Sequence, residues 1–293
     1  MAQRLCPLCA REGAWTQVLT TRDVVSREPF TIVACPSCQV LRTVPVPEDL
    51  TPYYDTDLGD MMKASPSRVH ASLKRILLGR ELRRIISRVH SGTFLDIGCG
   101  TGDFTALIHC KGLPVVAVDA SAKRPLAIEA IRTIPYYQMD FERSAILGFE
   151  PAGPYTVIVR HVLEHLKDPV AFLKRMIGYG ATSFYIVVPN AACLERRLLG
   201  QYWNLWDPPR HLWHFTPHSL QALLGNVNLA IVDRGFETIP NLVPSLYRFL
   251  RLKQFPSSMY NVLAPKGTLS ALSAPLNLVL PHNVLWALAQ VRS

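Results

Sequence analysis

The fold of this chain is decided by the stretch Phe94-Leu95-Asp96-Ile97-Gly98-Cys99-Gly100-Thr101-Gly102-Asp103-Phe104. A short, mostly apolar run ends, three glycines follow at every second position, and apolar residues then recur at helical spacing. This order predicts a strand, a tight loop and the start of a helix. Glycine adopts positive φ without strain, and a helix start offers unpaired N–H groups to an anion. The stretch therefore predicts a loop that binds a small anionic or zwitterionic ligand.

The spacing of the glycines separates the candidate ligands. A dinucleotide-binding loop reads G-x-G-x-x-G/A, whereas Asp103 occupies the third position here and Gly102 comes one residue early. A second apolar run, residues 114–118, ends at Asp119, 23 residues after Asp96. In a doubly wound sheet an acid at this place binds the two hydroxyls of a ribose. The pattern disfavours a pyrophosphate, and the alternative of a glycine-rich turn without a ligand leaves the second acid unexplained.

At these residues the chain resembles the class I S-adenosylmethionine-dependent methyltransferases, whose first motif reads D-x-G-x-G-x-G and whose second strand ends in an acid. Residues 162–169, V-L-E-H-L-K-D-P, are similar to a segment of the methyltransferases related to ubiquinone biosynthesis. The resemblance covers about residues 93–225. It implies an α/β fold with a doubly wound, mostly parallel Rossmann-like sheet, and S-adenosylmethionine as cofactor.

The resemblance also implies a set of cofactor contacts. It assigns the methionine half to Gly98, Gly100 and Gly102, the amino group to Asp96, the ribose to Asp119, the adenine amine to Asp140 and a lid to Tyr54 or Tyr53. Core packing is the alternative for the tyrosines, and a turn carboxylate is the alternative for Asp140.

Methyl transfer to a hydroxyl or an acidic carbon requires the removal of one proton, and histidine titrates near the pH at which this is needed. Aromatic residues and histidines are dense in residues 202–217, where R-H-L-W-H-F-T at 210–216 is similar to a segment of small-molecule methyltransferases. We expect His211 to be the base, with His214 and His161 as further candidates. A structural histidine bonded to a loop carbonyl is the alternative for each.

Four of the seven cysteines form two C-x-x-C pairs, Cys6 with Cys9 and Cys35 with Cys38, and 25 residues separate the pairs. In a reducing compartment this spacing predicts a tetrahedral zinc site, and residues 16–20 and 30–34 between the pairs predict the strands of a zinc ribbon. Two disulfides or redox pairs are the alternative. Four thiolates leave no open coordination position, so the zinc is expected to be structural.

The remaining organisation follows from composition. We expect a zinc ribbon at 1–45, a linker, aromatic lid loop and basic amphipathic helix at 46–92, the methyltransferase core at 93–240 and a partly helical extension at 241–293. The usual last strand of the fold is not recognisable, and late strands are expected at 229–232 and 236–239. Neither a signal pattern nor an apolar run of about 18 residues appears, which favours a cytoplasmic protein.

These observations favour methylation of a small-molecule or sugar-containing intermediate, at oxygen or carbon. The net charge of +9 and the cationic face of residues 68–90 are compatible with nucleic acid or a peripheral membrane contact, although such a face is usually solvated. An RNA methyltransferase is therefore one alternative, disfavoured by the few lysines and arginines of the ribbon. A non-catalytic cofactor-binding or scaffold protein is the other.

Overall fold

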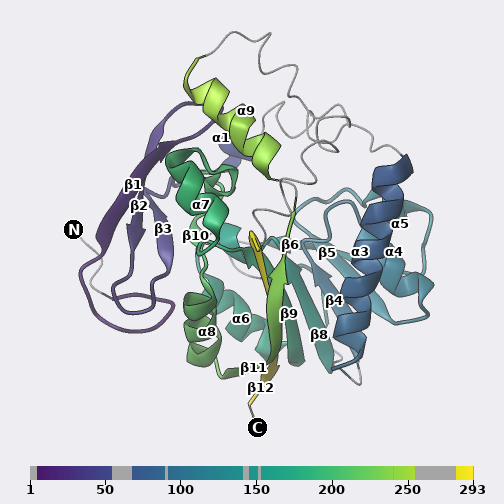
Figure 1. Cartoon of the computed structure of the whole chain (residues 1–293). Coiled ribbons are helices and arrows are strands. Elements are labelled where there is room, and N and C mark those ends of the chain that lie inside the picture. The colour runs from purple at the N-terminus through teal and green to yellow at the C-terminus, as the bar shows by residue number, and fades with distance from the viewer. Residues whose placement is uncertain are drawn as a thin grey trace. The chain divides into compact units, whose positions relative to one another are not determined.

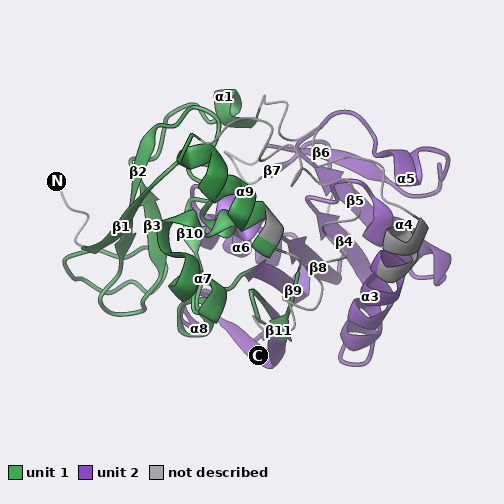
Figure 2. Ribbon diagram, turned by 45° about the horizontal axis from the view of Figure 1, so that its top comes forward, with its two compact units in different colours: residues 1–70, 189–220, 236–285 green, residues 71–188, 221–235, 286–293 purple. Residues whose placement is uncertain are grey.

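The structure is a computed structural model that describes residues 5–54, 68–89, 92–140, 145–150, 153–239, 241–254 and 282–292. The chain forms two compact units, each assembled from separate stretches of sequence (Figure 2). Unit 1 comprises Met1–His70, Pro189–Leu220 and Phe236–Leu285, and unit 2 comprises Ala71–Val188, Gln221–Gly235 and Trp286–Ser293.

Unit 2 is built on an eight-stranded sheet with the strand order β11-β12-β9-β8-β4-β5-β6-β7 (Figure 1). In chain order the strands are β4 (Thr93–Ile97), β5 (Val115–Asp119), β6 (Tyr136–Asp140), β7 (Ala145–Ile146), β8 (Tyr155–Arg160), β9 (Ala181–Pro189), β11 (Leu229–Glu237) and β12 (Val284–Val291). β4 pairs in parallel with β5 and β8, β5 with β6, and β8 with β9, whereas β7 is antiparallel to β6. The predicted mostly parallel Rossmann-like sheet is confirmed.

The central position of β4 explains its sequence. Phe94, Leu95, Asp96 and Ile97 are all buried, as expected for a parallel strand covered on both faces. The helices of this part of the chain are α3 (Arg68–Ile86), α4 (Asp103–Cys110), α5 (Leu126–Glu129), η1 (Leu163–His165), α6 (Pro169–Gly178) and α8 (Pro217–Asn226). The chain thus alternates strand and helix and brings the ends of β4, β5 and β8 to one edge of the sheet.

Two expectations about the late strands are corrected. The predicted pair of strands at 229–232 and 236–239 is one continuous strand, β11, in which Gly235 lies against the Trp286 ring: a Cβ added there would come within 2.7 Å of that ring. The last strand that the sequence did not reveal is β12, which lies between β11 and β9. The segment 282–292 therefore contributes to the central sheet.

Unit 1 contains the predicted ribbon, extended by one strand from a distant part of the chain. Its four-stranded sheet has the order β1 (Thr16–Arg22), β2 (Pro29–Ala34), β3 (Leu41–Val44) and β10 (Trp213–His214). The two ribbon strands predicted at 16–20 and 30–34 are confirmed as β1 and β2. A hydrophobic cluster that includes the fully buried Trp203 and Trp206 packs against this sheet.

The helices that the structure describes in unit 1 are short. They are α1 (Thr51–Tyr54), α7 (Leu194–Leu199), η2 (Gly200–Tyr202), η3 (Asn204–Trp206) and α9 (Leu242–Leu252). Among the described residues, no helix combines the length and apolarity that crossing a bilayer requires. The acidic part of the expected lid loop, residues 55–60, and most of the expected C-terminal extension, residues 255–281, lie outside the described residues. The domain boundaries given above stay predictions.

Candidate functional site

The glycine loop connects β4 to α4, and its backbone needs glycine at the predicted positions. Gly98 has φ 69° and Gly102 has φ 79°, a left-handed conformation that other residues adopt only with strain. At Gly98 there is also no room for a side chain, because an added Cβ would lie 2.3 Å from Cγ2 of Val162. The Gly98 N–H donates to the Val118 carbonyl at 2.8 Å, which ties the loop to the end of β5.

The acid at the end of β5 faces this loop. One carboxylate oxygen of Asp119 accepts a hydrogen bond from the Gly100 N–H at 2.9 Å, and the other accepts from the Ser121 N–H at 3.2 Å. Asp119, Gly100 and Ser121 line a cavity of about 580 Å³. Asp103, Lys123 and Tyr136 line it as well. This volume lies within the range of sites that bind drug-sized ligands. Two of the predicted cofactor residues, Gly100 and Asp119, thus share one cavity.

The chemistry of this cavity suits S-adenosylmethionine. A carboxylate at the end of the second strand accepts hydrogen bonds from paired hydroxyls, as a ribose would supply. At Gly100 the loop presents backbone to the cavity, because this residue has no Cβ and no atom lies closer than 4.0 Å to the place that a Cβ would take, so a ligand can approach it closely. The residues present fit the cofactor that the sequence implies.

Asp96 and Asp140 do not line this cavity. Asp96 is 3% exposed, and its carboxylate accepts a hydrogen bond from the Thr105 hydroxyl of α4 at 2.5 Å. Burial raises the pKa of Asp96 to about 6, although the Thr105 hydroxyl opposes the shift. Asp140 ends β6, as the sequence predicted. The cofactor contacts assigned to the two acids stay predictions.

Among the cavity residues that had no predicted role are Asp103, Lys123 and Tyr136. The Asp103 carboxylate accepts from the Lys74 ammonium of α3 at 2.6 Å and from the Thr101 hydroxyl at 2.7 Å. Burial acts to raise the pKa of Asp103, but these two donors lower it overall. Lys123 lies in the loop that follows Asp119, and Tyr136 is the first residue of β6. Their closeness in sequence to the acid and to the next strand was the available signal.

His161 follows β8 in a left-handed conformation with φ 54°. Its side chain is 37% exposed, and Nδ1 lies 3.4 Å from the Glu164 carboxylate, which is fully buried. The carboxylate and the exposed imidazole face each other at the carboxyl end of a parallel strand. This is a place where α/β sheets position functional groups.

The other two candidate bases lie in unit 1. The His211 side chain is 8% exposed, and its Nδ1 lies 2.8 Å from the Leu205 carbonyl. Because a carbonyl oxygen only accepts, Nδ1 carries the proton and Nε2 carries the lone pair of the neutral ring. His214 is 1% exposed, and burial lowers its pKa well below the ordinary value. Burial therefore favours the neutral form of the His214 ring.

The tyrosine pair lies in α1. The Tyr53 hydroxyl donates to the Glu28 carboxylate of the ribbon, and its ring meets Phe30 edge-on with centroids 6.2 Å apart. Tyr54 is 51% exposed. Tyr53 thus contacts the ribbon, and the lid role of Tyr53 or Tyr54 stays a prediction.

The four cysteines of the ribbon converge. The sulfurs of Cys6 and Cys38 are 3.8 Å apart, those of Cys9 and Cys35 are 4.0 Å apart, and all four lie within 4.8 Å of one another. Four sulfurs about 2.3 Å from one tetrahedral zinc lie about 3.8 Å apart, whereas bonded sulfurs are about 2.05 Å apart. The contact between Cys6 and Cys38 lowers the pKa of Cys6 and raises that of Cys38, so the pair favours one thiolate before any metal binds. The donor set and its spacing fit zinc.

Comparison with known proteins gives one family match. A family model described as a methyltransferase domain matches residues 72–234. A ubiquinone biosynthesis O-methyltransferase of Caulobacter vibrioides is 28% identical over 158 residues, which are 47% of this chain and 60% of that protein. A malonyl-[acyl-carrier protein] O-methyltransferase of a Paenibacillus species is 25% identical over 193 residues, 58% of this chain and 66% of that protein. The chain thus spans less than two thirds of these relatives.

Solved structures share the fold at low sequence identity. Magnesium protoporphyrin IX methyltransferase from Synechocystis, solved with S-adenosylhomocysteine, has a TM-score of 0.52 and 14% identity, and the match covers 82% of this chain and 97% of that chain. The plantazolicin methyltransferase has a TM-score of 0.52 and 17% identity over 83% of this chain and 94% of its own. At these identities the likeness shows a common fold.

Proposed function

Because the chain belongs to the class I S-adenosylmethionine-dependent methyltransferase family, we propose that it transfers a methyl group from S-adenosylmethionine to a small molecule. The observation that carries the proposal is the Asp119 carboxylate, bound to the Gly100 N–H at 2.9 Å and lining a cavity of about 580 Å³. The bound cofactor would supply a methyl group already activated by its sulfonium. The protein then has to hold the cofactor, align the acceptor and accept one proton.

The cofactor side of the proposal uses the residues of the glycine loop. Gly98, Gly100 and Gly102 would hold the methionine half, and Asp119 the ribose. The buried Asp96 would act on the amino group, Asp140 near the adenine, and Tyr54 as part of a lid. Asp103, whose carboxylate is bound by Lys74, and the cations Lys123 and Arg124 also line the cavity, so both signs of charge are available to a zwitterionic amino-acid group.

His211 is the proposed base. The Leu205 carbonyl fixes the proton on Nδ1 and directs the lone pair to Nε2, the arrangement that a general base needs. His161 is the second candidate, because the Glu164 carboxylate lies 3.4 Å from its Nδ1 and would stabilise the protonated ring. His214 is the third, and its 1% exposure supports a mainly structural part.

An oxygen or carbon acceptor is proposed, in a small molecule or a sugar-containing intermediate. The curated relatives named above are O-methyltransferases, which supports oxygen. Cys6, Cys9, Cys35 and Cys38 would hold one structural zinc ion. Since thiolate ligands persist where thiols stay reduced, we place the protein in the cytoplasm.

The test is methyl transfer from S-adenosylmethionine labelled in its methyl group. The purified full chain is incubated with the small-molecule fraction and, separately, with the RNA fraction of its host cells. The proposal predicts label in small molecules that is reduced in the Asp119→Ala variant when the cofactor is not saturating. Label in RNA alone would establish the RNA methyltransferase, and cofactor binding without transfer to either fraction would establish the non-catalytic protein.

A further inference from the structure

Strand β3 of the ribbon holds the segment that carries two candidate bases. β3 pairs with β10, so that Leu41 lies opposite His214 and Arg42 opposite Trp213. Next to this pairing, the fully buried Thr43 donates its hydroxyl proton to the His211 carbonyl at 2.7 Å. Its backbone N–H donates to the Leu212 carbonyl at 3.0 Å. One ribbon residue thus fixes consecutive peptide groups of the distant segment.

The same hydroxyl determines which ring nitrogen of His214 carries the proton. The Thr43 oxygen lies 3.0 Å from Nε2 of His214 and has already given its only proton to the His211 carbonyl. It can therefore only accept from His214, so the ring is protonated on Nε2 and carries its lone pair on Nδ1. Thr43 links the backbone of one histidine to the ring of the other.

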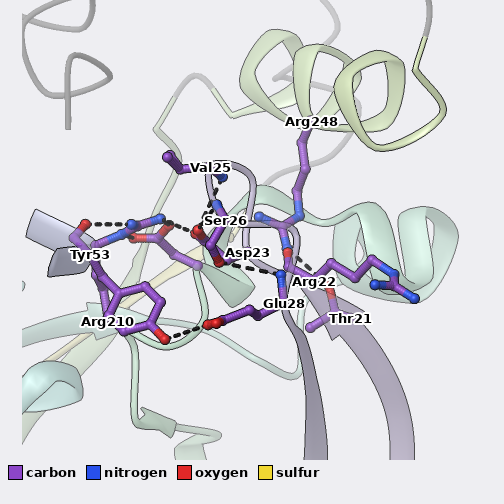
Figure 3. A network of polar contacts seen from close by, with 10 residues as sticks. Thr21, Arg22, Asp23, Val25, Ser26, Glu28, Tyr53, Arg210 and Arg248 are labelled. Carbon is purple, nitrogen blue, oxygen red and sulfur yellow. Dashed lines mark hydrogen bonds and ion pairs between the residues drawn. The ribbon is translucent and has the colours of Figure 1, made fainter. Parts of the chain in front are cut away.

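A second attachment lies at the turn between β1 and β2 (Figure 3). Asp23 is fully buried, and one of its oxygens accepts from the N–H groups of Val25 and Ser26 at 3.1 and 2.7 Å. Its other oxygen accepts from Nη2 of Arg210 at 3.1 Å. Arg210 directly precedes His211, so the turn of the ribbon is joined by a buried ion pair to the residue beside the proposed base.

The Arg210 guanidinium has two further hydrogen-bond partners besides Asp23. It donates to both oxygens of Asp207 at 3.0 and 2.5 Å, and its Nη1 donates to the Tyr53 carbonyl at 2.7 Å. Burial acts to raise the pKa of Asp207, but Arg210 brings it to about 2. The guanidinium therefore fixes both ends of the turn 207–210 that leads into His211.

A second arginine balances the charges of this cluster. Arg248 of α9 is 1% exposed, and its Nη2 donates to the Thr21 hydroxyl at 2.9 Å and to the Arg22 carbonyl. With Asp23, Asp207 and Arg210 the cluster contains two acids and two arginines. Burial lowers the pKa of Arg248 to about 10, so the guanidinium still carries its charge at neutral pH. A neutral sum offsets the cost of burying Asp23, Arg210 and Arg248, whereas the Asp207 side chain is 31% exposed.

The cysteine cluster lies at the start of β3. β2 ends at Ala34, the knuckle Cys35–Cys38 forms the turn, and β3 begins at Leu41. The Cys35 N–H donates to the Val40 carbonyl at 2.9 Å, which closes this turn. A metal ion bound by the four thiols would therefore fix the strand that contacts His211 and His214.

We propose that Asp23 and Thr43 are positioning residues, through which the metal-loaded ribbon fixes the backbone and ring orientation of His211 and His214. The ribbon is then the frame of the proton-accepting segment rather than a separate binding module. This inference rests on the proposed function, because it concerns the same proposed base.

The test follows the segment 207–214 directly by amide hydrogen exchange in the zinc-loaded full chain. Thr43→Val removes the hydroxyl at nearly constant volume, and we expect exchange in 211–214 to rise on the order of tenfold, the effect of one buried hydrogen bond. Thr43→Ser keeps the hydroxyl and should restore the wild-type rates. Thr16→Val, on an exposed part of β1, is the matched control and should change nothing in this segment.

A second readout separates positioning from general stability. In ¹⁵N NMR spectra His214 should be the Nε2–H form in the wild type and in Thr43→Ser, and should lose that preference in Thr43→Val. Removal of zinc by a chelator, and Asp23→Asn, should both increase exchange at 207–214. Unchanged exchange and an unchanged His214 tautomer in Thr43→Val would overturn the inference. S-adenosylmethionine binding is titrated in parallel. A chain that does not bind S-adenosylmethionine would refute the proposed function, whereas the exchange result would be unaffected.

Discussion

Replacing Gly98 by alanine tests the geometry of the glycine loop. At φ 69° a residue with a Cβ costs about 1–2 kcal/mol in backbone strain. The new Cβ would also lie 2.3 Å from Cγ2 of Val162, whose branched side chain is stiff, and such overpacking costs about 1–3 kcal/mol. We therefore expect Gly98→Ala to lower the free energy of unfolding by about 2–5 kcal/mol in urea titrations.

The matched control is Gly100→Ala. Gly100 also has positive φ, but the nearest atom to its added Cβ is a backbone oxygen 4.0 Å away, so only the strain of about 1–2 kcal/mol remains. In a double-mutant cycle, Val162→Ala should recover about 1–3 kcal/mol of the Gly98→Ala loss. Equal losses for the two alanine variants, or no coupling to Val162, would show that the loop does not have the described packing.

Three further changes probe the cofactor acid, the buried acid and the metal. Asp119→Ala should weaken S-adenosylmethionine binding by about 1–3 kcal/mol in calorimetric titrations, because a charged acceptor is lost; unchanged affinity would reject the ribose assignment. Asp96 has a folded-state pKa of about 6, above its unfolded value, so it stabilises the fold below pH 4 and this contribution is lost as pH rises through 6. In urea unfolding, the free energy of unfolding of the wild type should fall by about 3 kcal/mol relative to Asp96→Asn as the pH rises from 4 to 6. If the free energies of the two proteins change in parallel with pH, the raised pKa of Asp96 is contradicted. Cys35→Ala should remove bound zinc, measured by elemental analysis, and lower the melting temperature, whereas Cys110→Ser, at an exposed thiol outside the cluster, should keep one zinc per chain.

The parts of the fold that sequence predicts are those encoded locally. The strand, loop and helix around Gly98 follow from a few adjacent residues, and the two C-x-x-C pairs specify their own cluster. β12 was missed because Val284–Val291 is a nearly continuous apolar run, in which burial on both faces removes the alternation that marks a strand. β11 was divided in two because the polar residues Asp233 and Arg234 interrupt its apolar pattern.

The polar clusters of unit 1 could not be predicted from the sequence, because their members lie far apart along the chain. Arg248 binds Thr21 across 227 positions of sequence, and Arg210 binds Asp23 across 187. A periodic sequence pattern covers only neighbouring residues, so it cannot predict a pair this far apart. By sequence alone, each arginine is indistinguishable from an ordinary charged residue on the surface. The tautomers of His211 and His214 likewise depend on Leu205 and Thr43, which become neighbours only in the folded chain.

The most direct measurement is the position of S-adenosylhomocysteine in a crystal structure of its complex with the full chain. We expect the ligand in the cavity lined by Gly100 and Asp119, with the ribose hydroxyls on the Asp119 carboxylate and the amino-acid end along the glycine loop. A ligand bound elsewhere, or an Asp119 carboxylate turned away from the ribose, would contradict the assignment of this loop as the cofactor site.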